Sequence, residues 1–276
     1  MAERTLAGKI AWVTGSSRGI GRVVADHLAS LGADVAIHGT SPYTTRTFQE
    51  AESLPALAES MAKAHGVRVI PVCGDLTDEA TVNGIVAEIH EKLGPIDILV
   101  NSAGGDIGAQ GITGPNAGKP AGNNALDISL QDIRTVLDRN IMTCILCCRA
   151  VGAEMRARRT GWIVNIGSIA GLSGHESEAI YSTAKAAVHE YTRCLAAMLR
   201  PYDVHVNAVA PGGTLSPRFI ASRPIDESRK VTAGTLDRYG WPMEMATVVA
   251  FLVTPASSFM TGQVLRVDGG SQLFPA

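Results

Sequence analysis

The sequence predicts an α/β fold in which one doubly wound parallel sheet of about seven strands carries helices on both faces. Two observations support this prediction. Short β-rich runs alternate with longer helical patterns along the chain, and the short runs are almost continuously apolar, as strands buried on both faces are. Right-handed crossovers between such strands give the doubly wound arrangement. Because no shift in composition and no internal repeat marks a boundary, we expect a single domain over residues 1–276.

Each element is predicted from its own run of residues. The runs expected to be strands cover 9–15, 34–39, 67–73, 96–102, 162–168, 204–210 and 263–267. The patterns expected to be helices cover 19–31, 50–65, 78–93, 129–159, 178–199 and 242–253. In such folds ligands bind beyond the carboxyl ends of the strands, so groups directly after a strand are the favoured candidates for a site.

Residues 104–124 fit neither pattern. Seven of these 21 residues are Gly, three are Asn and two are Pro. The segment could be a linker, a disordered insert or part of a site. Both flanks belong to the same predicted sheet, which argues against a linker. We favour a loop that forms a pocket wall or a subunit contact and narrows the choice of substrate, with disorder as the alternative.

Composition and charge exclude several functions. The 276 residues are 46% apolar and 18% charged, which is enough to bury a sizeable core. The net charge is −2 and the charges are scattered, so we expect no nucleic-acid or membrane partner. No run reaches the roughly 18 apolar residues that a membrane span needs.

The cysteines point to a reducing compartment. The sequence has five, an odd number, and no apolar run near its start that could serve as a signal peptide, so we expect a cytoplasmic location. Cys144, Cys147 and Cys148 lie in an apolar helical run with no second ligand cluster. We expect them to be small core side chains, and we expect no metal site.

A glycine-rich turn follows the first predicted strand and opens the first predicted helix. In "TGSSRGIG", residues 14–21, the glycines would let the backbone approach a pyrophosphate, whose charge the helix N-terminus favours. The alternative is a tight turn needed only for packing. No Gly-Lys-Ser/Thr follows, which excludes a phosphate loop of the nucleoside-triphosphatase type. The candidate cofactor-binding residues here are Gly15, Ser17, Arg18, Gly19, Ile20 and Gly21.

The end of the second strand bears on the choice of cofactor. Sites for NAD usually place an acid there for the ribose 2′-hydroxyl. Here Gly39, Thr40 and Ser41 provide none, and Asp34 lies at the opposite end of the strand. Arg18 in the glycine turn could bind a 2′-phosphate through its planar donors. The sequence therefore favours NADP(H) over NAD(H).

Two further candidates follow the third and fourth strands. Asp75 could accept a hydrogen bond from an adenine amino group, although it could instead cap a helix, a role that Thr77 or Asp78 fills more naturally. The small residues of "NSAG", 101–104, would let a nicotinamide ribose pack closely.

The motif "YSTAK" places Tyr181 and Lys185 four residues apart, on one face of a predicted helix. Tyrosine ionises near about pH 10, too high for acid–base catalysis at neutral pH, but a neighbouring ammonium would lower that pKa. Ser168 directly follows the fifth strand, where its hydroxyl could bind a carbonyl oxygen. A Tyr–Lys pair alone is more often a surface feature; the combination with the glycine turn and Ser168 favours chemistry.

These motifs together resemble the short-chain dehydrogenase/reductase family, of the compact single-domain type and closest to 3-oxoacyl-(acyl carrier protein) reductases. The resemblance covers essentially the whole chain, in family order, and implies a fold of Rossmann type. It rests on TGSSRGIG, Asp75, NSAG, Asn140, Ser168, YSTAK, "NAVAPGG" (207–213) and "FLVTPASSFMTGQVLRVDGG" (251–270).

The resemblance implies specific roles. Tyr181 is the general acid or base, Lys185 lowers its pKa and holds the nicotinamide ribose, Ser168 orients the substrate oxygen, and Asn140 helps to hold a water linked to Lys185. The further cofactor-binding residues are Leu76, Asn101, Ala103, Gly104, Pro211, Gly212 and Thr214, with Tyr181 and Lys185 contributing to the same site.

Two departures from the family pattern stand out. Ser102 stands where the family often has a second Asn, and Asn101 and Asn140 are 39 positions apart, longer than expected for this branch. The excess falls in residues 104–124.

Residues 213–235 are polar and resemble the mobile substrate lid of the family. Four basic residues there could attract an anionic substrate, although a solvated loop, which also carries Asp226 and Glu227, is the simpler interpretation. These four are Arg218, Arg223, Arg229 and Lys230. His175 and Glu176 could contact a polar substrate or lie in a surface loop.

Three functions remain open. The first is an NADPH-dependent carbonyl reductase of 3-oxoacyl type, and the second is a dehydrogenase of a sugar, polyol or hydroxy acid. The third, a non-enzymatic dinucleotide sensor, is disfavoured because Tyr181 and Lys185 are both present. The low aromatic content, 5%, and the polar insert argue gently for a hydrophilic substrate. The resemblance also implies a homotetramer, or a homodimer, formed through helices 129–159 and 178–199.

Overall fold

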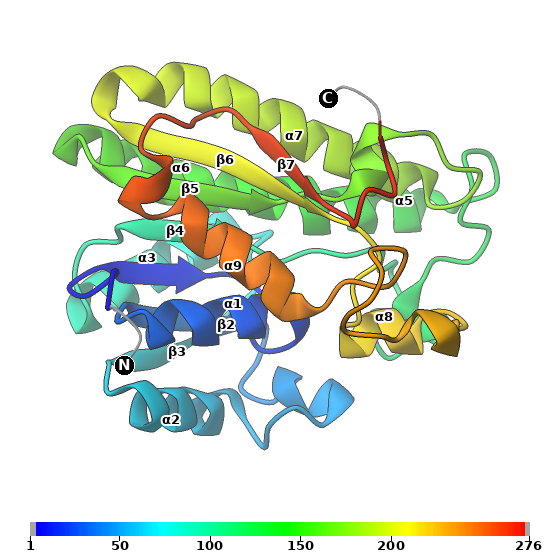
Figure 1. Cartoon of the computed structure of the whole chain (residues 1–276), viewed down its shortest axis with the longest axis horizontal. Helices are drawn as coiled ribbons and strands as arrows, with labels where there is room; N and C mark the ends of the chain where they lie inside the picture. The colour runs from blue at the N-terminus through cyan, green and yellow to red at the C-terminus, as the bar shows by residue number, and fades with distance from the viewer. Residues whose placement is uncertain (1–3, 274–276) are drawn as a thin grey trace.

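The computed structural model describes residues 4–273 and contains one seven-stranded parallel sheet (Figure 1). The strand order is β3-β2-β1-β4-β5-β6-β7, which confirms the predicted doubly wound sheet. The strands are β1 (Ile10–Val13), β2 (Asp34–Gly39), β3 (Val69–Cys73), β4 (Ile98–Asn101), β5 (Gly161–Ile166), β6 (Val204–Pro211) and β7 (Val264–Val267).

Helices cover both faces of the sheet. The α-helices are α1 (Gly19–Ser30), α2 (Leu54–His65), α3 (Glu79–Lys92), α4 (Pro115–Gly118), α5 (Leu130–Leu137), α6 (Thr143–Arg158), α7 (Ala179–Leu199), α8 (Pro217–Ala221) and α9 (Pro242–Leu252). Short 3-10 helices span Thr44–Phe48, Ile169–Leu172, Arg200–Tyr202, Glu227–Arg229 and Pro255–Ser257. None of the helices within residues 4–273 is both long and apolar enough to cross a membrane.

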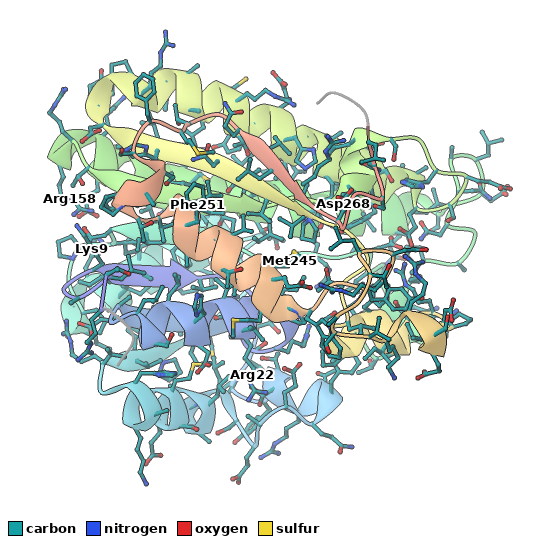
Figure 2. The ribbon with its side chains drawn as sticks, in the orientation of Figure 1. Lys9, Arg22, Arg158, Met245, Phe251 and Asp268 are labelled. Carbon is teal, nitrogen blue, oxygen red and sulfur yellow. The ribbon has the colours of Figure 1, made fainter. Side chains whose placement is uncertain are left out.

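The core has two layers, one on each face of the sheet. Helices α1, α2 and α9 pack on one face, where Met245 of α9 is buried (Figure 2). Helices α3, α6 and α7 pack on the other face. In β1, Ala11 and Val13 face the first layer, whereas Trp12 faces the second, because side chains alternate along a strand. Burial on both faces explains why the strands are continuously apolar.

The predicted site residues lie at the end of the sheet where the carboxyl ends of the strands meet. This end is called the carboxyl edge below. Figure 2 shows Lys9, which precedes β1, and Arg158 at one edge of the molecule. Asp268, directly after β7, lies at the other end of the strands, at the carboxyl edge. The turn of residues 14–21 and the segment 104–124 leave β1 and β4 toward this second edge.

The predicted helix over 129–159 is present as a helical run from Leu130 to Arg158. It is divided into α5 and α6 by a π-helical turn at Asp138–Met142. The Asn140 side chain is part of the reason, because its Nδ2 donates to the carbonyl of Val136 at 2.8 Å. In a regular α-helix that carbonyl receives the main-chain N–H of residue 140. Single π-helical turns inside helices often occur at functional sites.

The predicted helix over 50–65 begins four residues later than expected. The Ser53 side chain accepts a hydrogen bond from the main-chain N–H of Ala56 and caps α2 at Leu54. The residues before it form the 3-10 helix Thr44–Phe48 and an irregular turn.

Residues 104–124 fold back on themselves at the carboxyl edge. Gly108 N–H donates to Gly118 O at 2.9 Å across the segment. Ala109 N–H donates to the Asp132 carboxylate at 2.8 Å, which joins the segment to α5. Its helical turn α4 lies against α8. The segment therefore joins two neighbouring strands of one sheet, β4 and β5, rather than two sheets.

Candidate active site

A cleft of about 800 Å³ lies at the carboxyl edge of the sheet and runs from the glycine turn to Tyr181. Most of the residues selected from the sequence line it. Among the predicted catalytic and cofactor-binding residues, three lie outside the cleft lining: Ser41, Asn101 and Asn140.

The glycine turn packs so closely against the NSAG segment that side chains would not fit. Gly15 has φ +61°, and a Cβ there would lie 2.8 Å from Ala103 Cα. A Cβ on Gly21 would lie 2.6 Å from Gly15 O. The Thr14 hydroxyl accepts from the N–H groups of Ser102 and Ala103 at 3.0 and 3.1 Å. The turn and the NSAG segment therefore form one rigid wall of the cleft.

A buried histidine that the sequence reasoning missed supports this wall from below. The Nδ1 atom of His38, in β2, accepts from Gly15 N–H at 3.1 Å, and its Nε2 lies 3.0 Å from Gly74 O. Burial lowers the pKa of His38 to about 4, so the ring is neutral at physiological pH. A polar residue within an otherwise apolar strand was the available signal.

The end of the cleft near β2 carries one positive side chain, Arg18, and one negative side chain, Glu50. Arg18 lines the cleft and donates to Thr44 O at 3.2 Å. The Glu50 carboxylate, which the sequence reasoning missed, accepts from Gly19 N–H at 3.0 Å and caps the first turn of α1. Burial lowers the pKa of Arg18, and the Glu50 charge opposes that shift. Glu50 escaped notice because it lies 11 residues beyond the end of β2.

Asp75 lies in the cleft lining at the end of β3. Its Oδ1 atom accepts from the main-chain N–H and the hydroxyl of Thr77, at 2.9 and 2.8 Å. The cap of α3 is Asp78, whose carboxylate accepts from Thr81 N–H. Asp75 is therefore not the cap of this helix. Its neighbour Leu76 is buried beneath the cleft.

Tyr181, Lys185 and Ser168 converge at the other end of the cleft. Lys185 Nζ lies 5.7 Å from the centre of the Tyr181 ring and donates to Ile166 O at 2.8 Å. The Ser168 hydroxyl lies close enough to Tyr181 to lower the pKa of its phenol. The helical spacing of four residues on α7 and the exit of the chain from β5 bring these groups together.

Burial shifts the pKa values of both groups on α7. It raises the pKa of Tyr181 to about 12, although the Ser168 hydrogen bond and the charge of Arg218 work in the opposite direction. It lowers the pKa of Lys185 to about 8. Both shifts favour the neutral form, as expected for ionisable groups removed from water.

The two asparagines outside the cleft lining hold the backbone around it. Asn140 accepts from Gly105 N–H and donates to Gly105 O, both at 2.9 Å, so it fixes the first residues after NSAG. Asn101 is buried and donates to the Asn165 side chain at 2.8 Å, which ties β4 to β5. Ser41 accepts from the Thr44 side chain through its carbonyl in the turn after β2.

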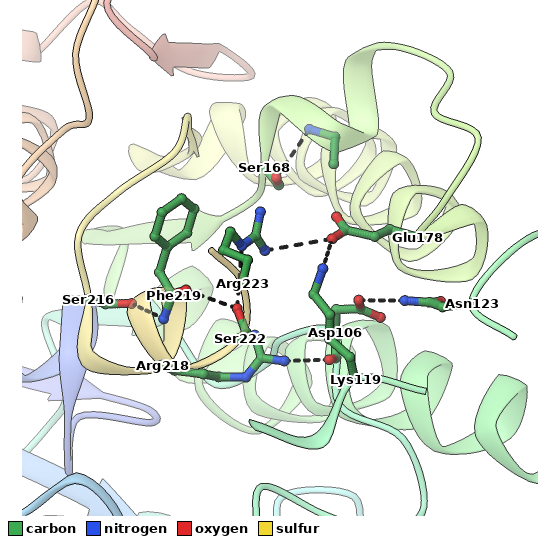
Figure 3. A network of polar contacts seen from close by, with 11 residues as sticks. Asp106, Lys119, Asn123, Ser168, Glu178, Ser216, Arg218, Phe219, Ser222 and Arg223 are labelled. Carbon is green, nitrogen blue, oxygen red and sulfur yellow. Dashed lines mark hydrogen bonds and ion pairs between the residues drawn. The ribbon is translucent and has the colours of Figure 1, made fainter. Parts of the chain in front are cut away.

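One wall of the cleft is strongly polar (Figure 3). Arg218 and Arg223 of the segment 213–235 face Asp106 and Lys119 of the segment 104–124, with Glu178 at the start of α7 between them. Lys119 donates to Glu178 Oε1, and Arg223 lies 3.6 Å from the same oxygen. The two segments and α7 therefore meet at one wall of the cleft.

The four basic residues of the lid separate into two pairs. Arg218 and Arg223 line the cleft. Arg229 instead pairs with Asp237 at 3.1 Å, and Lys230 pairs with Glu227 at 3.0 Å, both outside the cleft lining. The sequence reasoning singled out His175 and Glu176, but the lining contains His175 and Glu178.

No cluster of three or more His, Cys, Asp or Glu side chains that could hold a metal ion occurs within residues 4–273. Cys144, Cys147 and Cys148 are buried and free. Burial raises the pKa of the Cys147 thiol well above its usual value, which favours the neutral thiol.

Comparisons with known proteins agree with this geometry. A family model described as enoyl-(acyl carrier protein) reductase matches residues 15–272. A 3-oxoacyl-[acyl-carrier-protein] reductase of Aquifex aeolicus is 38% identical, over 97% of this chain and 99% of its own length. A galactitol 2-dehydrogenase of Rhizobium johnstonii is 34% identical, over 96% and 95%. The structure of a 3-oxoacyl-[acyl-carrier protein] reductase with bound NAD from Brucella melitensis superposes with a TM-score of 0.78 at 29% identity, over 97% of this chain and 92% of that one.

Proposed function

Because the chain belongs to the short-chain dehydrogenase/reductase family of oxidoreductases, we propose that it interconverts a ketone and a secondary alcohol with a nicotinamide dinucleotide, using Tyr181 as general acid or base. One observation carries the proposal. A single cleft joins the glycine turn to the convergent Ser168, Tyr181 and Lys185 side chains. A dinucleotide lying along such a cleft would bring its reactive ring to the tyrosine.

The residues present fit such a cofactor. The cradle between Gly15, Gly21 and Ala103 has no room for a side chain, so main-chain groups line the turn at the N-terminus of α1. Gly15, Ser17, Arg18 and Ile20 would hold the pyrophosphate and adenosine end, and Pro211, Gly212 and Thr214 the nicotinamide end. When bound, the dinucleotide gives or accepts the hydride.

The side chains of this chain would supply the proton and the orientation. Ser168 would hold the substrate oxygen next to the Tyr181 hydroxyl, whose pKa it already lowers. For reduction Tyr181 donates its proton to that oxygen, and for oxidation it removes the proton of the alcohol. Lys185 would hold the nicotinamide ribose, and Asn140 would keep the Gly105 backbone and a proton-carrying water in place.

We propose that NADP(H) is preferred over NAD(H). Arg18 lies in the cleft lining beside Gly39 and Thr40, and the end of β2 carries no acid. Glu50 partly offsets the Arg18 charge, so the preference should be modest. The dissociation constants of NADPH and NADH, measured by fluorescence with the wild type and Arg18→Ala, test this. Preference for NADH in the wild type would contradict it.

For the substrate, the first candidate is a 3-oxoacyl-type carbonyl reduced with NADPH, which agrees with the named reductases among the relatives. The charged wall of Arg218, Asp106 and Glu178 favours a second candidate, a sugar, polyol or hydroxy acid. A panel of acyl thioesters, keto acids, ketoses and polyols, followed through NAD(P)H absorbance in both directions, decides between them. The absence of turnover with every member would favour a dinucleotide sensor instead.

A further inference from the structure

We propose that Arg218 binds an anionic group of the substrate, a carboxylate or a phosphate, so that the natural substrate is an acid such as a hydroxy acid or keto acid. This inference rests on the proposed function and names the substrate class of the same cleft.

The first support is that Arg218 is a cation without a counter-ion. Among residues 4–273 no carboxylate oxygen lies within 4.0 Å of a nitrogen of its guanidinium group. One Nη atom donates to the main-chain carbonyl of Asp106, and the buried Nε has no partner. A desolvated charge without a partner is costly, and an anionic ligand would compensate it.

The second support is that the neighbouring carboxylates are already engaged. The Glu178 carboxylate receives hydrogen bonds from Lys119, and Arg223 lies beside it. Although burial opposes ionisation, these two cations hold the pKa of Glu178 below its usual value. Glu178 therefore does not serve as the counter-ion of Arg218, and Figure 3 shows the two side chains directed to different partners.

The Asp106 carboxylate does not pair with the Arg218 guanidinium either. Its Oδ2 atom accepts from Asn123 at 2.7 Å, and its buried Oδ1 has no partner. Burial, followed by the Glu178 charge, raises the pKa of Asp106, although the Asn123 hydrogen bond and the charges of Lys119 and Arg218 act in the opposite direction.

The third support is the position of Arg218 relative to the reacting group. Arg218 shares the cleft lining with Tyr181 and Ser168. Its Nη1 atom would lie 3.7 Å from a Cβ placed on Gly105, so the guanidinium covers the backbone that follows NSAG. An anion on Arg218 would orient the substrate carbon toward Tyr181. Planar bidentate donors suit carboxylate and phosphate oxygens alike.

The decisive experiment compares acids with their neutral counterparts. We would measure kcat/KM for 3-hydroxybutyrate and its methyl ester, and for gluconate and sorbitol, with the wild type, R218Q and R218K. Because R218Q also removes a charge that acts on Tyr181, it affects acids and neutral compounds alike through that group. Loss of the charge-assisted contact should therefore lower kcat/KM in R218Q by at least about tenfold more for the acids than for their neutral counterparts, with R218K intermediate. K230Q removes one positive charge from the same lid outside the cleft and serves as the control.

A binding measurement separates this inference from the proposed function. Calorimetric titration with malonate and with inorganic phosphate, in the presence of NADP⁺, should show binding to the wild type and K230Q but not to R218Q, even if no tested alcohol is oxidised. Malonate binding without phosphate binding would assign the site to carboxylates, and the reverse result to phosphates. An equal response of acids and neutral compounds to R218Q would overturn the inference, and so would the loss of NADP⁺ affinity, which would assign Arg218 to the pyrophosphate.

Discussion

Tyr181 and Lys185 are four residues apart in the chain; Lys185 is buried and Tyr181 half-buried, and burial shifts the pKa of each toward its neutral form. Among the neighbours, the Ser168 hydrogen bond and the Arg218 charge stabilise the Tyr181 phenolate most. The family resemblance assigns the lowering of the Tyr181 pKa to Lys185. In this structure a second cation contributes, Arg218, which lies 37 positions further along the chain than Tyr181.

Tyr181→Phe removes the phenol hydroxyl and with it the rate enhancement that comes from proton transfer. The ring and its packing remain, so we expect kcat to fall at least about 100-fold while the dissociation constant of NADPH changes little. Steady-state kinetics and a fluorescence titration measure the two quantities. Near-normal turnover would refute the acid–base role of Tyr181.

Lys185→Met should change how stability depends on pH. Burial lowers the pKa of Lys185 from 10.5 to about 8 in the folded protein. Between these values the unfolded chain binds more protons at this residue than the folded chain, so its contribution to the free energy of unfolding rises with pH. Below the folded pKa, both states carry the charge and only the folded state buries it.

Urea unfolding of the cofactor-free wild type and Lys185→Met, at about pH 7 and about pH 10, tests this sign. The wild type should gain stability relative to the variant at the higher pH. Parallel behaviour of the two proteins would show that Lys185 has an ordinary pKa.

At the level of elements, the insert 104–124 is joined to the catalytic helix and to the lid. Glu178 N–H, at the N-terminus of α7, donates to Asn123 O at 2.7 Å, and Glu178 takes a left-handed conformation with φ 66°. Non-glycine residues take that conformation rarely and at some cost. Contacts with the C-terminal part of the insert, through Lys119 and Asn123, hold the residue there.

Removal of residues 107–122 should alter substrate preference without weakening cofactor binding. The side chains of Asp106 and Asn123 already hydrogen-bond at 2.7 Å, so the two ends of the deletion lie near each other and a short Gly-Ser bridge can join them. The loss of pocket contacts should change the ratios of kcat/KM across the substrate panel by about tenfold or more. The dissociation constant of NADPH provides the control. Unchanged ratios would mean that the insert has no part in specificity.

At the level of the whole molecule, apolar side chains remain exposed on the helices expected to form subunit contacts. Leu130 of α5 is 61% exposed and Met198 of α7 is 52% exposed. Exposed apolar groups gathered on such helices suit burial against another copy of the chain. We therefore retain the prediction of a homotetramer, with a homodimer as the alternative.

Sedimentation equilibrium tests that assembly. The mass should be four times, or twice, the 28.9 kDa of one chain. The double variant Leu130→Asp/Met198→Asp should sediment as a smaller species with unchanged circular dichroism, because charges at a buried contact are costly. A monomeric wild type would contradict the prediction.

The sequence by itself determined the sheet, its helices and the candidate chemistry. The apolar composition of strands such as Ile10–Val13 predicts that they are buried. The spacing of four residues predicts that Tyr181 and Lys185 share one face of a helix. Both predictions depend only on local periodicity. The tertiary structure alone decided the π-helical turn at Asn140, the cap that Glu50 provides to α1, and the wall formed by Asp106, Glu178 and Arg218. The cap and the wall depend on contacts between residues far apart in the chain, and the π-helical turn combines a local contact of Asn140 with Val136 and a distant one with Gly105. No local pattern records which polar groups the fold will bring together.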